Sequence, residues 1–184
     1  MEGTQTRDVG PPDEDAIYRE LGRFVVVFQA LENELLQLAS FALDPEHIGH
    51  GQRSVADLWF GQLVDKTETS VGAFLDDHRG AEPEFRDHLK NLLARCRELA
   101  DYRNKVVHSA YVFLEAGDEL IAILRSDMTR GAEENEVELE QELLKEDSFK
   151  EVMGEIARVA FEIAQCRLQL IHWYRPGRAS GLTN

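Results

Sequence analysis

The sequence predicts an all-α protein: an antiparallel bundle of four to five helices, with a small β-hairpin after the helix that begins near residue 83. Two observations lead to this prediction. Hydrophobic residues recur at steps of three and four residues along four long segments, which is the spacing of an amphipathic helix. A short region before the last of these segments holds two runs of β-branched and aromatic residues, which favour strands.

The first two expected helices cover residues 17–43 and about 55–77. Asp44-Pro45 ends the first of them, because the proline ring disfavours helical geometry in the residue before it. We interpret His47–Gly51, which contains two glycines, as a loop. Ser54 then has the character of a helix cap. Short connections of this kind place successive helices side by side.

The third expected helix starts with Pro83 and Glu84, which suit the first turn of a helix, and continues to His108. The runs 111–114 and 120–124 follow it and predict the hairpin. The remaining two segments are a connector and a helix. Residues 131–141 hold five glutamates and few large apolar side chains, so we expect either a solvated connector or the frayed start of the last helix there. A helical stripe from Phe149 to Trp173 predicts the last helix, which ends at Pro176-Gly177.

A length of 184 residues fits one domain, which we place at 16–176, with a disordered tail at 1–15 and a flexible tail at 177–184. Cys96 and Cys166 lie seventy positions apart in helical runs, which does not suggest a disulfide framework. The N-terminus lacks a basic start followed by an apolar core, and charges interrupt every apolar stretch before the roughly 20 residues that a bilayer requires. We therefore expect a cytoplasmic protein with no membrane partner.

The net charge of −15 argues against general nucleic-acid binding, because an acidic surface repels phosphates. No DNA partner is expected. The charge is uneven along the chain, however: residues 133–155 hold ten acids against two lysines, whereas residues 85–108 hold six Lys or Arg against three acids. A phosphate substrate would have to be confined to the basic helix.

Several enzyme classes lose support because their motifs are absent. The sequence has no glycine-rich phosphate loop, no Gly-x-Ser-x-Gly, no His-Glu-x-x-His and no paired Cys-x-x-Cys. His47 and His50 are close enough in sequence to share a metal ion, but no third or fourth ligand is evident, so we expect no metal and no cofactor. Asp76, Asp77 and His78 are interpreted as a solvated helix end.

One constellation carries chemistry: Arg103, followed directly by the polar Asn104 and, five positions after the arginine, by His108. The segment 99–109 resembles the signature of HEPN domains, a helical family whose ribonuclease members carry Arg, four to six residues and then His, often with a polar residue after the Arg. The Leu31-Glu32 pair in the first helix, Phe60-Gly61-Gln62-Leu63 and the hairpin are also similar to small bacterial HEPN-like proteins. Arg167 and His172 repeat the spacing, but Leu168 replaces the polar residue, so we set this pair aside.

The resemblance implies a homodimer in which two motif helices line one cleft and cleave RNA without a metal, with a toxin or a defence effector as the expected role. In this scheme His108 moves a proton, Arg103 stabilises phosphoryl charge and Asn104 orients either group. Attack by a 2′-hydroxyl would also distinguish RNA from DNA. The expected substrate-binding residues are Lys105, Tyr102 and Arg97.

Helix geometry favours a composite site. Asn104 and His108 lie on one face, whereas Arg103 and His108 point about 140° apart and are separated by about 7.5 Å along the axis, so one copy does not close a site easily. Tyr111 departs from the toxin members of the family, in which a tyrosine stands two positions after the histidine. An antitoxin or a nucleotidyltransferase-like protein is a possible partner.

Two other interpretations stay open: a non-catalytic dimeric interaction module, with the motif residues acting structurally, and a module that binds a nucleotide. Glu32 either faces Arg103 or is exposed, and we favour exposure because charged residues are seldom buried without a partner. Helical spacing assigns five aromatic residues to the core and not to a base-stacking surface: Phe24, Phe28, Trp59, Phe85 and Phe161.

Overall fold

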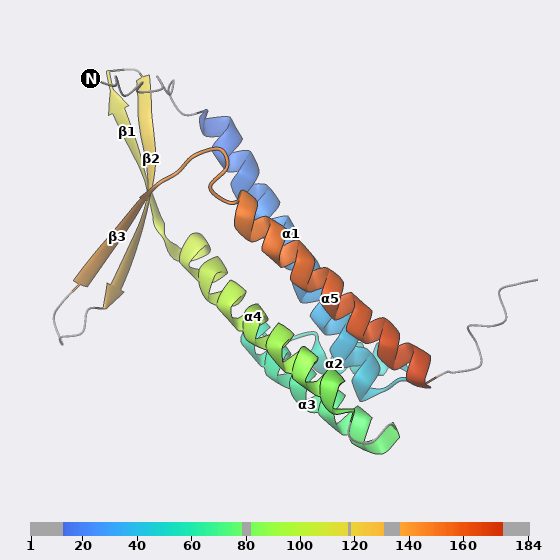
Figure 1. The fold of residues 1–184 in the computed structure, drawn as a ribbon. Helices are drawn as coiled ribbons and strands as arrows, with labels where there is room; N and C mark the ends of the chain where they lie inside the picture. The colour runs from blue at the N-terminus through green and yellow to red at the C-terminus, as the bar shows by residue number, and fades with distance from the viewer. Residues whose placement is uncertain (1–12, 79–81, 118, 131–136, 175–184) are drawn as a thin grey trace, which may run out of the picture. The chain divides into compact units, whose positions relative to one another are not determined.

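A computed structural model describes residues 13–78, 82–117, 119–130 and 137–174. These residues form five helices and three strands, and the protein is mostly helical, as the sequence predicts (Figure 1). The helices are α1 (Glu14–Leu43), α2 (Ile48–Val55), α3 (Phe60–His78), α4 (Pro83–His108) and α5 (Lys150–Tyr174). The strands are β1 (Ala110–Ala116), β2 (Glu119–Arg130) and β3 (Val137–Leu143).

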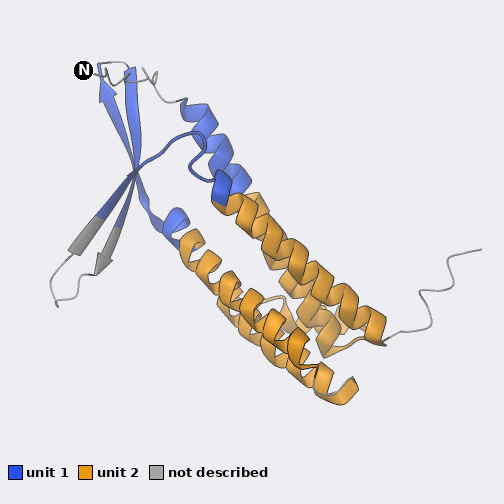
Figure 2. Cartoon of the chain, viewed as in Figure 1, with its two compact units in different colours: residues 1–24, 104–151 blue, residues 25–103, 152–184 orange. Residues whose placement is uncertain are grey.

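The chain divides into two compact units (Figure 2). Unit 1 comprises residues 1–24 and 104–151, and unit 2 comprises residues 25–103 and 152–184. The division falls within α1, α4 and α5. In α4 it lies between Arg103 and Asn104, inside the motif that the sequence singles out.

Unit 2 is a helical bundle whose helices run in two directions. Arg86 pairs with Asp76 and Arg97 pairs with Asp65, so α3 and α4 are antiparallel. Helices α4 and α5 are also antiparallel, because Phe85 lies against Trp173 while Arg95 pairs with Glu155. These contacts agree with the expected antiparallel bundle.

Helix α1 departs from that expectation. Phe28 contacts Phe60 near the start of α3, and Phe41 contacts Phe74 further along it, so the two helices are parallel. The same holds for α1 and α5, since Glu34 pairs with Arg167 while Phe41 lies against Tyr174. The physical reason is α2, a short helix between α1 and α3 that returns the chain before α3 begins.

Burial explains why the amphipathic segments form this bundle. Each of the longer helices turns fully or nearly fully buried large apolar side chains to a common core, and each Leu or Phe contributes roughly 1.5–3 kcal/mol when removed from water. The most buried examples of unit 2 are Leu31, Leu35, Leu38, Leu63, Leu75, Leu92, Leu93, Ile156, Ile163 and Leu170.

Several local predictions for unit 2 are wrong. Residues 48–51 belong to α2 and not to a loop, and Ser54 lies inside that helix, where its hydroxyl donates to the carbonyl of His50. Trp59 and Phe161 are 68% and 64% exposed, so neither belongs to the core. Trp59 lies in the connection between α2 and α3, where no helical stripe applies, and Phe161 falls on the solvent side of α5, which a stripe of three- and four-residue steps locates only within about one position. Phe24, Phe28 and Phe85 are buried as predicted.

Unit 1 contains the sheet. β2 is the central strand and pairs antiparallel with β1 on one side and β3 on the other. The β1–β2 hairpin is the predicted one, and Gly117 begins its turn with a φ of 67°, which costs glycine little. Phe24 of α1 packs against Phe149, with ring centroids 5.6 Å apart, and Tyr18 lies near Phe113.

The strand β3 corrects the prediction of a solvated connector at 131–141, of which residues 131–136 lie outside the described part of the chain. Val137, Leu139 and Leu143 alternate with the glutamates at 138, 140 and 142. This is the period of two that a strand with one apolar face requires. The count of glutamates obscured that alternation in the sequence.

The start of α1 differs from the tail that was expected there. Glu14 and Asp15 form the first turn of α1 instead of a tail, and Asp13 accepts the backbone N–H of Ala16 there. The rest of the predicted tail at 1–15 and all of the tail at 177–184 lie outside the described residues. Among the helices that are described, none is both long and apolar enough to span a bilayer.

Candidate active site

The motif lies on the last two turns of α4, which is a continuous helix as far as His108. Asn104, Lys105 and His108 are exposed, whereas Val106 between them is buried within unit 1. The carbonyls of the last turn are satisfied by the residues that follow. The hydroxyl of Ser109 donates to the carbonyl of Lys105, and the Tyr111 hydroxyl donates to that of Val106 at 2.7 Å.

This arrangement brings Asn104 and His108 together. The two side chains are four residues apart on one helical face, and both are open to solvent. In this position the imidazole can exchange a proton with a bound molecule, and the amide can form hydrogen bonds with the same molecule. Tyr111, three positions after the histidine, is half-buried and its hydroxyl is engaged with the end of α4.

Arg103 belongs to unit 2 and is half-buried. Its guanidinium carbon lies 5.9 Å from the centre of the Phe28 ring, a cation–π geometry. Phe28 is itself held by Phe60, at 4.8 Å between ring centroids. The flat face of the guanidinium is therefore supported by the aromatic pair, which limits the rotamers that Arg103 can adopt.

The expected substrate-binding residues are engaged with neighbours. Lys105 pairs with Glu140 of β3 at 3.7 Å, and Arg97 donates to both Asp65 and Glu68 of α3 at 2.9 Å. Hydrogen bonds from Arg97 to these two carboxylates, Asp65 first, raise the pKa of the guanidinium. Tyr102 is half-buried.

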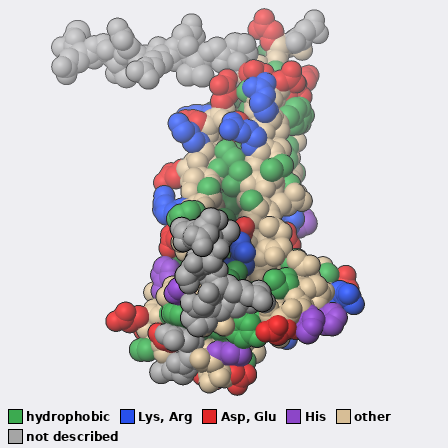
Figure 3. Space-filling model, turned by 90° about the vertical axis from the view of Figure 1, so that its right-hand side faces the viewer, with side chains coloured by type: hydrophobic (Ala, Val, Ile, Leu, Met, Phe, Trp, Pro, Cys, Tyr) green, Lys and Arg blue, Asp and Glu red, His purple; other side chains and the backbone are tan. Residues whose placement is uncertain are grey.

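The basic excess of α4 is thus largely neutralised in three dimensions. Arg86 pairs with Asp76, and Arg95 pairs with both Glu155 and Glu162. With Arg97 and Lys105, four of the six basic side chains of the helix contact carboxylates from other elements. On the face drawn in Figure 3, basic side chains likewise stand among acidic ones. The linear count along the sequence missed these acids because they come from α3, α5 and β3.

Arg167 and His172, the second pair with the same spacing, lie in a different environment on α5. Arg167 lies on α5 and donates to Glu34 of α1 at 3.1 Å, so it joins two helices of unit 2. Glu32, two residues before Glu34 on α1, is half-buried, whereas exposure was favoured from the sequence. Nothing in this surrounding resembles the exposed polar pair at the end of α4.

The two cysteines are poor candidates for a nucleophile. Both are free and buried, and burial raises the pKa of Cys96 to about 12 and that of Cys166 to about 11. Their thiolate fraction near neutral pH is therefore very small.

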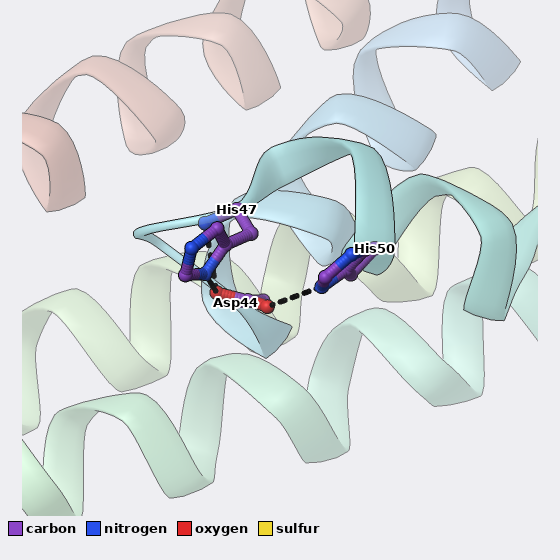
Figure 4. Close-up of side chains that lie close together, drawn as sticks. All are labelled: Asp44, His47 and His50. Atoms are coloured by element: carbon purple, nitrogen blue, oxygen red, sulfur yellow. Dashed lines mark hydrogen bonds and ion pairs between the residues drawn. The ribbon is translucent and has the colours of Figure 1, made fainter.

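One group of neighbouring side chains was not predicted from the sequence. Asp44 lies beside His47 and His50, and the three residues present ligand atoms within 4.8 Å of one another (Figure 4). The expectation that the two histidines have no third neighbour is therefore wrong. The signal was present in the sequence as an acid three residues before the first histidine, but Asp44 was interpreted only as part of the helix stop.

A shallow hollow lies elsewhere in unit 2, between α3 and the first turns of α4. Gly72, Leu75, Arg86 and Lys90 are among its lining residues. None of the predicted site residues lines it.

Comparison of the chain with protein-family models, with curated proteins and with solved structures found no match in any of the three. The functional argument therefore rests on the residues themselves.

Proposed function

We propose that the chain is a metal-independent endoribonuclease of the HEPN type that acts as a homodimer, with Arg103, Asn104 and His108 in its active site. The observation that carries the proposal is the exposure of Asn104 and His108 on one face of the last turn of α4, directly after Arg103. A histidine, an amide and an arginine in one short segment are groups that can support RNA cleavage by a 2′-hydroxyl.

In this mechanism the imidazole of His108 accepts the proton of a ribose 2′-hydroxyl. The 2′-oxygen attacks the adjacent phosphorus, and the bond to the 5′-oxygen breaks. The products are a 2′,3′-cyclic phosphate and a 5′-hydroxyl, to which His108 of the second copy delivers a proton. Arg103 stabilises the charge on the non-bridging oxygens with its planar donor fork, and Asn104 orients the phosphate by hydrogen bonding.

Two features support a dimer. The motif of one helix supplies a single imidazole, that of His108, and an arginine five positions before it points in a different direction, so a second helix supplies the missing groups. Unit 1 also exposes large apolar side chains, which a self-complementary contact can bury. They are Val107, Val112, Phe113, Leu114 and Ile121.

The test is RNA cleavage by the tag-free chain in EDTA. Wild type is expected to cleave, His108→Ala to lose about 10²–10⁴ in rate and Arg103→Ala at least about 10². The chain offers a matched control, His172→Ala, which removes the histidine of the same spacing on α5 and is expected to keep full activity. An inactive wild type, or a His108→Ala variant as active as wild type, would contradict the proposal.

The second candidate is a non-catalytic dimeric interaction module. It is favoured by the ion pairs of α4, since Arg86, Arg95, Arg97 and Lys105 are already bound to carboxylates and offer little free charge to RNA. This candidate predicts a dimer in light scattering that lacks any ribonuclease activity. It also predicts that Arg103→Ala weakens the dimer or lowers the melting temperature.

A further inference from the structure

The turn between α1 and α2 holds three ligand-type side chains in a row of equal spacing. Asp44 directly follows the last residue of α1, His47 precedes the first residue of α2, and His50 lies in the first turn of that helix. Steps of three residues through a turn and into a helix bring the side chains to one side. Figure 4 shows both imidazoles turned towards the carboxylate of Asp44.

Each imidazole lies near a different oxygen of the Asp44 carboxylate, at a distance that is compatible with a shared cation. Nδ1 of His47 lies 3.4 Å from Oδ1 of Asp44, and Nδ1 of His50 lies 3.5 Å from Oδ2. A charge-assisted hydrogen bond between such groups would be about 2.7–2.9 Å long. Two ligand atoms bound to one zinc ion at about 2.0–2.1 Å, with a tetrahedral angle between them, are instead about 3.3 Å apart.

The backbone already holds the group in position. Oδ1 of Asp44 accepts the backbone N–H of His47 at 2.8 Å, and the N–H of His50 donates to the carbonyl of His47 at 2.8 Å. The two imidazole rings are stacked, with centroids 5.3 Å apart and 23° between their planes. Little ordering is left for a bound ion to impose, which lowers the entropic cost of binding.

The exposure and the charge of these three side chains also suit the binding of a cation. The side chains of His47 and His50 are 69% and 64% exposed, so an ion can reach them from solvent. Asp44 adds a carboxylate to the two imidazoles, so the group can offer a negative charge to a cation. Two imidazoles and one carboxylate are the donors that Zn²⁺ and related transition ions prefer, whereas Mg²⁺ and Ca²⁺ prefer oxygen ligands only.

We propose that Asp44, His47 and His50 form a binding site for a divalent transition-metal ion of the Zn²⁺ class, which joins the end of α1 to the start of α2. Three protein ligands leave at least one position for water. The site lies in unit 2, on a different segment from α4, and its role is to fix the α1–α2 turn. It is independent of the ribonuclease chemistry, which is proposed to need no metal.

The test is isothermal titration of the tag-free, EDTA-stripped and dialysed chain with ZnCl₂. Wild type is expected to bind one equivalent, and CoCl₂ is expected to give the visible absorption of an imidazole-ligated ion. His50→Ala and Asp44→Asn are expected to weaken Zn²⁺ binding by at least about tenfold, because even outer partners of metal ligands contribute that much. The asparagine can still accept the His47 backbone N–H, so this variant should keep the turn.

The matched control is His172→Ala, which removes an exposed histidine on α5 and should leave the titration unchanged. MgCl₂ should give no saturable heat. The proposal is overturned if wild type shows no stoichiometric binding, if Asp44→Asn binds as tightly as wild type, or if His172→Ala loses as much affinity as His50→Ala.

Discussion

The contact between α2 and α1 makes a sharp prediction about two glycines of the same short helix. A Cβ added at Gly51 would lie 2.2 Å from the carbonyl oxygen of Ser40 and under 3.0 Å from two further backbone atoms of that residue. Ordinary contact begins near 3.4 Å, so α2 would have to move by about an ångström. A Cβ at Gly49 meets nothing within 4 Å.

We expect Gly51→Ala to lower the free energy of unfolding by about 1–3 kcal/mol, the usual cost of overpacking. For a chain of this length that corresponds to a fall of about 2–12 °C in the melting temperature. Gly49→Ala should instead raise stability by up to about 1 kcal/mol, because alanine favours a helix more than glycine does. Urea unfolding of the two variants beside wild type measures the difference. Equal stabilities of Gly51→Ala and Gly49→Ala would refute the close approach of α2 to α1.

Two further predictions concern charge and pH. Arg95→Ala, which removes the half-buried link from α4 to Glu155 and Glu162, should cost about 1 kcal/mol, whereas Arg158→Ala, which removes an exposed pair within α5, should cost less than about 0.5 kcal/mol. The Arg95 hydrogen bond lowers the pKa of Glu155, so the stabilisation by this ion pair is present above the ordinary glutamate pKa and is lost as the pH falls below about 4. Urea unfolding of Arg95→Ala and wild type at about pH 3 and about pH 7 measures this change. An equal loss of stability in Arg95→Ala at both pH values would contradict the prediction. The buried thiols, whose pKa values are raised to about 12 for Cys96 and about 11 for Cys166, should destabilise the fold by about 1.4 kcal/mol each for every pH unit above about 9, because the unfolded thiols ionise first. Cys96→Ala should therefore lose less stability between pH 8 and 10 than wild type does, and parallel losses would show that this thiol is not shielded.

Helix periodicity was sufficient for the main elements. The first segment has a clear apolar stripe and is followed by Pro45, and the third has a clear stripe and begins with Pro83; the expected end at Leu43 agrees with α1, and the expected bounds Pro83 and His108 agree with α4. α2 was missed because its eight residues include Gly49 and Gly51, which disfavour a helix unless packing supplies the stability. That packing is the contact of Gly51 with Ser40, which only tertiary structure reveals.

The candidate site was predictable in its exposed part only. The position of Asn104 and His108 on one face follows from their spacing. The partners of Arg97 and Lys105 do not, since Asp65 and Glu140 are distant in sequence and reach α4 through the fold. Counting charges along the sequence of α4 therefore overstates the positive electrostatic potential at this helix, because the count omits the acidic partners from other elements.

The ribonuclease account is tested most directly by cleavage, in EDTA, of an RNA oligonucleotide and of the same oligonucleotide with a single 2′-deoxy sugar at the cleaved position. The account predicts that wild type cuts the RNA to leave a 2′,3′-cyclic phosphate, that the deoxy substitution blocks this cut, and that His108→Ala cuts neither. Intact RNA after incubation with wild type, or cleavage of the deoxy substrate at the same bond, would contradict it.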